Sequence, residues 1–334
     1  MIASIIIPVY NEEKYIEACL DSILLEGVLP KETEIIIVDG MSMDRTVDMI
    51  RQYQQEHSDI ILLENPKKIV PVAMNIGIKK ARGTYIIRLD AHATYTPEYV
   101  RQMLAWHQKL DADNVGGVVV TEVKNRTVKS NAIKAVLSSR FGVGNSDFRT
   151  GVKALKSVDT VPFGCYPQSV FDRYGLYDER LIRNQDIELN KRIVNGGGKI
   201  YLLPDVQCTY YARETLQALA KNNFANGLWN MLTAYYTKTF RSLSLRHFVP
   251  LLFVLSLLLP GIASLFYPKL FWVSLLSLLS YLSLVIIVSL KLQQSKAHFG
   301  YLILGFLVLH LSYGAGSLWG LCLVCMKKIK GKDV

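Results

Sequence analysis

Two patterns of apolar residues divide the chain. Over residues 3–203, short apolar runs rich in β-branched residues alternate with polar stretches of helical spacing. The runs predict buried strands at residues 3–9, 35–39, 60–63 and 85–89. The stretches between them predict helices at residues 11–25, 44–56 and 71–83. This alternation indicates right-handed βαβ crossovers, so we expect an α/β fold with a parallel sheet.

The pattern is less regular after residue 90. Further elements are expected as a strand at 115–122, helices at 169–174 and 186–194, and a short strand at 199–203. Residues 125–160 are basic and contain glycine. Their weak periodicity favours a mobile loop or short helices over the site.

The last third of the chain follows a different pattern. Residues 215–247 mix apolar and polar positions at helical spacing, as an interfacial helix does, although an ordinary surface helix fits equally well. Three segments without formal charge follow, at 248–266, 270–290 and 299–326. The first two approach the roughly 20 residues that span a bilayer, and the third is longer. We therefore expect membrane segments.

Composition supports this division. The 334 residues exceed one typical domain, and 50% of them are hydrophobic against 20% charged. The net charge is +10, and its bases cluster around the apolar segments, where they suit anionic lipid headgroups. These bases are Lys238, Arg241, Arg246, Lys327, Lys328, Lys330 and Lys332. No basic run is interleaved with aromatic residues, so nucleic acid is not an expected partner.

Two of the predicted strands run into an acidic residue, Asp39 and Asp90. In open α/β sheets ligands bind beyond the carboxyl ends of the strands. If the chain stays extended there, Asp90 and His92 point to the same side and can share a divalent metal that holds a diphosphate. The alternative is that Asp90 caps the next helix and His92 is merely exposed.

Five short motifs occur in order. They are Ser-Ile-Ile-Ile-Pro-Val-Tyr-Asn-Glu at 4–12, Ile-Val-Asp-Gly-Met-Ser-Met-Asp-Arg-Thr at 37–46, Asn-Ile-Gly at 75–77, Arg-Leu-Asp-Ala-His at 88–92 and Asn-Gln-Asp at 184–186. With these motifs the chain resembles a family 2, inverting glycosyltransferase of GT-A fold. Within that family it is similar to bacterial exopolysaccharide enzymes of the succinoglycan group.

The resemblance implies a domain plan. Residues 1–214 would form a GT-A (Rossmann-like) nucleotide-sugar-binding domain, and 215–247 interfacial linker helices. Residues 248–326 would form an α-helical membrane region, and 327–334 a basic tail.

It also implies site residues. Asp90 and His92 would hold Mn²⁺ or Mg²⁺, and Asp39 would line the base and ribose pocket of the nucleotide-sugar donor. The other implied substrate-binding residues are Pro8, Tyr10, Glu12, Asn75, Arg88, Gly164 and Gln185, with Asp90 counted among them as well.

The sequence departs from the family pattern at three places. The metal motif is usually Asp-x-Asp, and its second acid is His92 here, which suits manganese better than magnesium. Met74 stands where an arginine that contacts the diphosphate is common. No Gln-x-x-Arg-Trp follows Arg213, so the motif of processive synthases is missing and single-sugar transfer is favoured.

Inverting transfer needs a base on the face opposite the leaving group. We assign Asp186, because it follows the strands that form the site and a carboxylate is already ionised near neutral pH. The alternative role for Asp186 is a helix N-cap.

We therefore expect a membrane-bound glycosyltransferase that moves a sugar from a nucleotide-sugar donor to a lipid-linked glycan in exopolysaccharide or cell-surface polysaccharide synthesis. The expected donor is a UDP-sugar. Alternatives are a polyprenyl-phosphate sugar synthase, a non-catalytic nucleotide-sugar-binding membrane protein and a transporter. Within the apolar segments only His310 is ionisable, which argues against a transport path.

Nucleotide sugars require a catalytic domain on the cytoplasmic side of a multi-pass protein of the cell membrane. Three full crossings would then place the lysine-rich tail outside, against the preference of such clusters for the cytoplasm. Gly314–Gly316 and Pro260–Gly261 interrupt two of the apolar segments. We expect one of these two segments, 248–266 or 299–326, to be re-entrant or in-plane, which leaves two crossings.

Overall fold

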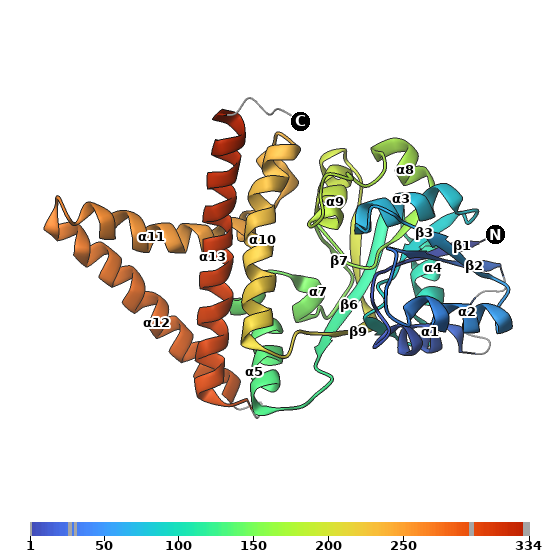
Figure 1. Cartoon of the computed structure of the whole chain (residues 1–334), viewed down its shortest axis with the longest axis horizontal. Helices are drawn as coiled ribbons and strands as arrows, with labels where there is room; N and C mark the ends of the chain where they lie inside the picture. The colour runs from blue at the N-terminus through green and yellow to red at the C-terminus, as the bar shows by residue number, and fades with distance from the viewer. Residues whose placement is uncertain (1, 26–28, 30–31, 294–296, 330–334) are drawn as a thin grey trace. The chain divides into compact units, whose positions relative to one another are not determined.

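The structure is a computed structural model that describes all residues except 1, 26–28, 30–31, 294–296 and 330–334. The chain folds into two compact units (Figure 1). The catalytic unit comprises Met1–Val120 and Asp147–Tyr211, and the helical unit comprises Thr121–Ser146 and Ala212–Val334. Residues 121–146 therefore pack with the C-terminal helices rather than with the sheet.

The catalytic unit is built on a sheet that has nine strands within the described residues. Its order is β3 (Ile60–Glu64), β2 (Thr33–Asp39), β1 (Ala3–Val9), β4 (Tyr85–Arg88), β8 (Cys165–Pro167), β6 (Asn114–Glu122), β9 (Ile200–Tyr211) and β5 (Ala93–Tyr95), and β7 (Lys156–Ser157) pairs with β9. The first four strands are parallel. The pairs β4–β8, β8–β6, β5–β9 and β7–β9 are antiparallel. The sheet is thus mixed, and the expectation of a parallel sheet holds only for its first half.

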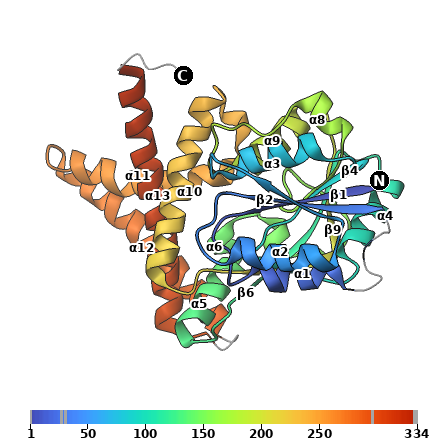
Figure 2. The same cartoon turned by 45° about the vertical axis from the view of Figure 1, so that its right-hand side comes forward.

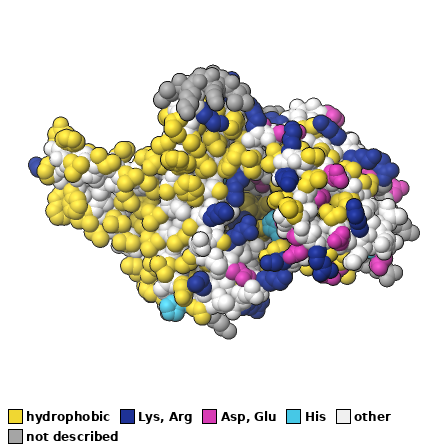
Figure 3. All heavy atoms as spheres, in the orientation of Figure 1, with side chains coloured by type: hydrophobic (Ala, Val, Ile, Leu, Met, Phe, Trp, Pro, Cys, Tyr) yellow, Lys and Arg dark blue, Asp and Glu magenta, His cyan; other side chains and the backbone are white. Residues whose placement is uncertain are grey.

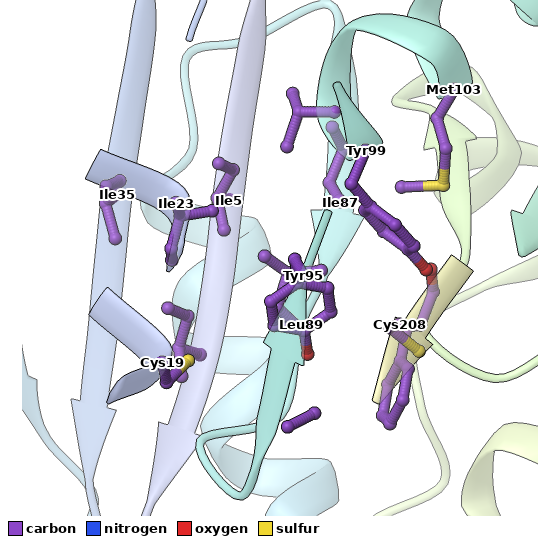
Figure 4. Close-up of a cluster of buried hydrophobic side chains, with 14 of the residues drawn as sticks. Ile5, Cys19, Ile23, Ile35, Ile87, Leu89, Tyr95, Tyr99, Met103 and Cys208 are labelled. Atoms are coloured by element: carbon purple, nitrogen blue, oxygen red, sulfur yellow. The ribbon is translucent and has the colours of Figure 1, made fainter. Parts of the chain in front are cut away.

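Helices cover both faces of this sheet (Figure 2). On one face α1 (Ile16–Leu24), α2 (Thr46–Glu56) and α4 (Tyr99–Lys109) pack on side chains such as Ile5 and Ile35. Figure 4 shows this cluster, in which Tyr95 and Tyr99 lie beside Leu89 and Ile87. On the other face α3 (Val70–Lys80), α8 (Ser169–Tyr174) and α9 (Gln185–Asn195) pack on the alternate strand residues. Because successive strand residues point to opposite faces, an unbroken apolar run serves both layers.

Several predicted elements are confirmed, including β1, β2, β3, α2, α3, α8 and α9. The helix expected from residue 11 begins only at Ile16, since residues 10–13 form a loop. The last strand extends to Tyr211 rather than ending at residue 203. Residues 125–160 hold α5 (Val128–Leu137), α6 (Arg140–Val143), α7 (Asp147–Thr150) and β7.

The helical unit contains α5, α6, α10 (Leu216–Tyr236), α11 (Val249–Ala263), α12 (Phe271–Gln293) and α13 (Phe299–Ile329). Among the described residues, three stretches are long and apolar enough to cross a membrane: Leu245–Ala263, Pro268–Gln293 and Phe299–Lys328. Gly314–Gly316 does not interrupt α13, which is one continuous helix, and Pro260 lies inside α11. Lys330 and Lys332 of the expected basic tail lie outside the described residues.

Candidate active site

The carboxyl ends of the parallel strands gather most of the expected site residues. Val9 and Asp39 are partners in the register of β1 and β2, and Ile6 pairs with Arg88 at the end of β4. Asp90 and His92 follow beyond β4, where residues 91–92 form a turn, so the expectation that the chain stays extended there is wrong. This edge is where open α/β sheets bind ligands.

The loops after β1 and β2 hold each other in place. The hydroxyl of Ser42 donates to Asp39 Oδ1 (2.5 Å) and accepts the N–H of Asn11 (2.8 Å). The N–H of Glu12 donates to the hydroxyl of Thr46 (2.8 Å). The Tyr10 ring remains 45% exposed, with the Lys68 ammonium 5.8 Å from its centroid. A half-exposed aromatic ring above a fixed loop is suited to stacking against a planar base.

Arg88 is a buried cation at the centre of the site. Its Nη2 lies 3.2 Å from Asp90 Oδ1, and Nε lies 3.3 Å from the same oxygen. Burial acts to lower the pKa of Arg88, but the carboxylates of Asp90 and Asp186 outweigh it and raise the pKa above its usual value. The guanidinium is therefore charged at every working pH, and the structure brings Arg88, Asp90 and Asp186 into one electrostatic cluster.

Three buried polar atoms in this cluster have no hydrogen-bond partner among the described residues: Arg88 Nη1, Gln185 Oε1 and the Tyr177 hydroxyl. Arg88 and Gln185 are each only 7% exposed, and Tyr177 is 3% exposed. A buried donor or acceptor left without a partner is costly, so such atoms mark places where a ligand can complete the bonding. A diphosphate or a sugar hydroxyl offers acceptors for the first, and a sugar hydroxyl offers a donor for the second.

The backbone of Asp90 is fixed by Tyr95. The Tyr95 hydroxyl accepts the N–H of Asp90 (2.8 Å) and donates to its carbonyl (3.1 Å). Burial raises the pKa of Tyr95 well above its ordinary value, so the hydroxyl keeps its proton. The turn that carries Asp90 is thereby held to one conformation.

His92 is oriented by a carboxylate. Its Nδ1 lies 3.1 Å from Glu12 Oε1, and the edge of its ring meets Tyr210, with centroids 5.4 Å apart. Because a carboxylate can only accept, Nδ1 carries the proton and the ring lone pair lies on Nε2. Arg149 from α7 lies over the Tyr210 ring, with its guanidinium 5.3 Å from the ring centroid.

His92 is oriented as a ligand of a divalent metal would be, whereas the Asp90 carboxylate faces Arg88. A metal-bound histidine usually donates its second ring N–H to a carboxylate, as His92 does to Glu12. Burial, and then the charges of Asp90 and Glu12, raise the pKa of the Cys19 thiol, so this buried cysteine stays protonated beside the site. Within the described residues no group of three His, Cys, Asp or Glu side chains is close enough together to hold a metal ion. Mg²⁺-type sites commonly use one or two protein ligands, with waters and substrate phosphates for the rest.

Asp186 lies in the first turn of α9. Asn184, in the left-handed region with φ 62°, turns the chain into this helix, and Asp186 Oδ1 accepts the N–H of Ile187 (2.9 Å). The carboxylate thus sits at the positive end of α9, beside the Arg88 cluster.

Asn75 and Gly164 make structural contacts. The Asn75 side-chain amide donates to the backbone carbonyl of Tyr177 (2.9 Å), and Asn75 Oδ1 accepts the backbone N–H of Tyr177 (3.0 Å). These two bonds tie the segment before α9 to α3. The carbonyl of Gly164 accepts the N–H of Arg88 (3.0 Å). A Cβ at Gly164 would stand 2.3 Å from Asn114 Oδ1, so only glycine fits there.

Comparison with known proteins identifies the family. The family model described as Glycosyl transferase family 2 matches residues 4–178, which is more than half of the chain. The chain belongs to glycosyltransferase family 2. The match begins in β1 and includes the Asp39, Arg88, Asp90 and His92 positions.

Curated family 2 relatives have functions in glycan synthesis. A dolichyl N-acetyl-α-D-glucosaminyl phosphate 3-β-D-2,3-diacetamido-2,3-dideoxy-β-D-glucuronosyltransferase of Methanococcus voltae is 31% identical over 232 residues, 67% of this chain and 71% of the relative. The succinoglycan biosynthesis protein ExoA of Rhizobium meliloti is 30% identical over 234 residues, 67% of each chain.

Among solved structures, residues 1–349 of S. aureus TarS align with a TM-score of 0.51 at 18% identity, covering 99% of this chain and 92% of that 1–349 chain. The same protein in complex with UDP-GlcNAc aligns with a TM-score of 0.51 at 15% identity, with the same coverage. This likeness shows the GT-A-like fold.

Sequence reasoning missed Tyr95, Arg149 and Tyr210. Tyr210 lies beyond the expected end of the last strand, and Arg149 lies in a segment of weak periodicity. Both are distant from the motifs along the chain, so no local signal points to them. Tyr95 carried one usable signal, since it follows Asp90 by five residues in the same turn and short strand.

Proposed function

We propose that this family 2 glycosyltransferase is a membrane-bound, inverting enzyme that transfers one sugar from a UDP-sugar to a lipid-linked glycan in exopolysaccharide or cell-surface polysaccharide synthesis. The observation that carries the proposal is the Arg88, Asp90 and Asp186 cluster, in which the buried Arg88 Nη1 has no hydrogen-bond partner among the described residues. A site built this way offers a fixed cation to an anionic donor and a carboxylate to an acceptor.

The donor would lie along the carboxyl edge of the parallel strands. Asp39 and the loop of Pro8, Tyr10 and Glu12 would contact the base and ribose, with the Tyr10 ring as a stacking surface. Arg88 Nη1 would donate to the diphosphate or the sugar, and Gln185 Oε1 would accept a hydrogen bond from a sugar hydroxyl. Asn75 would act indirectly, because it holds the segment of Tyr177 to α3. Gly164 would likewise position Arg88.

Asp90 and His92 would hold a divalent metal, Mn²⁺ or Mg²⁺. When bound, that ion neutralises the diphosphate as a Lewis acid. Glu12 would orient His92 for this role, and Tyr95 would fix the backbone of Asp90. Arg149, stacked on Tyr210, would add positive charge beside the same group.

Asp186 would take the proton of the acceptor hydroxyl as that oxygen attacks C1 of the sugar. The C1–O bond to the diphosphate breaks on the opposite face, so the configuration at C1 inverts. Arg88 would keep Asp186 in place electrostatically while meeting the leaving group. Positioning both reactants in line is itself a large contribution to the rate.

The protein would lie in the cell membrane as a multi-pass protein with its catalytic unit in the cytoplasm, where nucleotide sugars are made. The relatives' names support a lipid-bound acceptor for one and an exopolysaccharide product for the other. A polyprenyl-phosphate sugar synthase remains the second candidate within the family, because its acceptor is also lipid-bound.

One assay separates the two candidates. The detergent-purified protein is given UDP-sugars with Mn²⁺ or Mg²⁺ and one of two acceptors, polyprenyl phosphate or a polyprenyl-linked sugar. We expect transfer to the lipid-linked sugar only, with inversion of the anomeric centre measured by NMR of the product. Transfer to polyprenyl phosphate alone would establish the synthase, and retention of configuration would contradict the proposed mechanism.

A further inference from the structure

Helices α10 and α13 lie side by side and run in the same direction. Their backbones approach closely at glycines: a Cβ on Gly316 would stand 2.0 Å from the carbonyl oxygen of Phe224, and one on Gly227 would stand 2.0 Å from that of Tyr313. Farther along, Lys327 Nζ donates to the Tyr236 hydroxyl (2.7 Å). Small residues that permit such contact are typical of tightly paired helices. The two helices therefore end on the same side of any membrane.

This pairing is incompatible with a transmembrane α13. If α13 crossed the bilayer, α10 would cross beside it, yet α10 is not among the three stretches apolar enough to span and carries Lys221, Asn222, Asn226 and Asn230. Crossing would also bring the bases after both helices to the outer side. Lys238 and Arg241 follow α10, and Lys327 and Lys328 end α13. Such clusters prefer the cytoplasm.

Apart from Lys328 in the last turn, the exposed side chains of α13 form one stripe. They include Leu304, Leu311, Ala315, Trp319, Cys322 and Met326. Their separations of seven, four, four, three and four residues keep them on one face of the helix. Elsewhere α13 is covered by α10, by α5, by parts of α11 and α12, and by α6, whose Phe141 carbonyl lies 2.9 Å from His310 Nε2. One apolar stripe backed by protein suits a helix that lies in the plane of the interface.

Helices α11 and α12 differ from α13 in exposure. Only 11% and 17% of the residues in their spans are buried, against 39% for α13. Hydrophobic side chains cover the visible face of both (Figure 3). The two helices are joined to each other by the Ser256–Ser277 hydroxyl pair (2.7 Å) and by Ser274 donating to the Leu257 carbonyl (2.7 Å). In both cartoon views α11 runs across α13 rather than along it.

The ends of this hairpin have the composition of two membrane interfaces. Its tip carries Tyr267, Lys269 and Trp272, an aromatic and basic group typical of a headgroup region. Its base carries Arg246 before α11 and Lys291 near the end of α12. As α-helices, the 15 residues of α11 and the 23 residues of α12 measure about 22 Å and about 34 Å, lengths that bracket the roughly 30 Å hydrocarbon core.

We propose that only α11 and α12 cross the membrane, as a helical hairpin whose tip faces outward, and that α13 lies in the cytoplasmic interface with its apolar stripe in the lipid. The proposal rests on the cytoplasmic catalytic unit proposed above. It explains how the basic end of α13 stays inside, and it selects the 299–326 segment as the in-plane one.

Spin labels along the stripe test the orientation of α13. Cys322 and Cys325 are first replaced by alanine in the full-length protein. Single cysteines are then introduced at Leu304, Leu311, Ala315 or Trp319, or the native Cys322 is restored alone, and each protein is placed in phosphatidylethanolamine–phosphatidylglycerol vesicles. The buried Cys19, Cys165 and Cys208 remain. Depths measured by oxygen and nickel accessibility should be nearly equal, about 5–10 Å below the headgroups. A maximum at Ala315 with shallow ends would overturn the proposal. Labels at Trp272, Leu279 and Leu290 of α12 provide the control, with Leu279 deepest.

Labelling of intact cells tests the sides. In the same background, cysteines at Phe266, Gln293, Lys328 and Glu98 are exposed to an impermeant maleimide before and after permeabilisation. Only the Phe266 site should react on intact cells. Reaction at Lys328 would make α13 a third crossing, and an unreactive Phe266 site would mean that the hairpin does not cross. Reaction at Glu98, in the catalytic unit, would instead contradict the proposed cytoplasmic function, while the depth profile of α13 would still test its orientation.

Discussion

The contact between Glu12 and His92 makes a graded prediction about metal affinity. Glu12 Oε1 lies 3.1 Å from His92 Nδ1, and the side chains are 19% and 33% exposed. Glu12→Gln keeps an acceptor in place but removes its charge, and Glu12→Ala removes the acceptor. Loss of a residue that orients a metal ligand typically costs about 10–100-fold in metal affinity. We expect the glutamine variant near the low end and the alanine variant near the high end, or about 1.4 and 2.7 kcal/mol.

The assay is Mn²⁺ binding in the presence of UDP, followed by the EPR signal of free Mn²⁺. Glu13→Gln is the matched control, because Glu13 accepts the N–H of Arg45 (3.2 Å) on the neighbouring loop. Equal Mn²⁺ affinity in all four proteins would refute the role of Glu12. If Glu12 instead contacts the nucleotide alone, both substitutions will weaken UDP binding by the same factor with and without metal.

Three further predictions concern the buried charges. Arg88→Met should lower the stability of the catalytic unit by about 3–5 kcal/mol, seen as a lower melting temperature, because it leaves Asp90 unpaired. Adding Asp90→Asn to this variant should recover part of the lost stability, and no recovery would contradict the pairing. Glu34 has a lowered pKa: burial acts to raise it, but hydrogen bonds from Ser4 and Arg82 outweigh this, so its stabilisation is present above the unfolded pKa and lost as pH falls through the folded one. Glu34→Gln should thus have a lower melting temperature than wild type at pH 7, and the difference in melting temperature should become smaller below about pH 4. A difference that stays constant with pH would contradict this. Arg149→Gln should weaken UDP binding about tenfold and reduce its salt dependence, whereas Arg101→Gln should change neither.

The sequence predicted the first half of the sheet because its strands are long apolar runs that end in a carboxylate. The edge that carries Asp39 and Asp90 follows from those runs by strand geometry, whereas His92 lies in a turn that no apolar run predicts. Strands β5 and β8 have only three residues each, too few for any periodicity, and this is why the antiparallel half was not foreseen.

Other features depend on contacts that a single sequence does not encode locally. An arginine in an apolar strand suggests an exposed position, because a buried charge is costly. Arg88 is buried nevertheless, because Asp90, two residues further along the chain, neutralises its charge. The sequence predicts an interruption of the helix at Gly314 and Gly316. In the structure a Cβ at these positions would stand 2.5 Å from the Pro250 carbonyl oxygen and 2.0 Å from the Phe224 carbonyl oxygen, so the glycines permit close helix packing that only the partner helices reveal. The composition of residues 121–146 fits packing on either unit. They pack on α13 through tertiary contacts, which the local sequence does not reveal.

The central claim is that Asp186 is the base for sugar transfer, and the single-turnover rate of Asp186→Asn tests it most directly. With saturating UDP-sugar, metal and lipid-linked acceptor, we predict a rate about 10²–10⁴-fold below wild type. The dissociation constant for UDP should stay at the wild-type value, since only acceptor deprotonation is lost. Asp172→Asn, at an exposed position of α8, is the control and should leave both quantities unchanged. A rate for Asp186→Asn equal to that of the control would contradict the account.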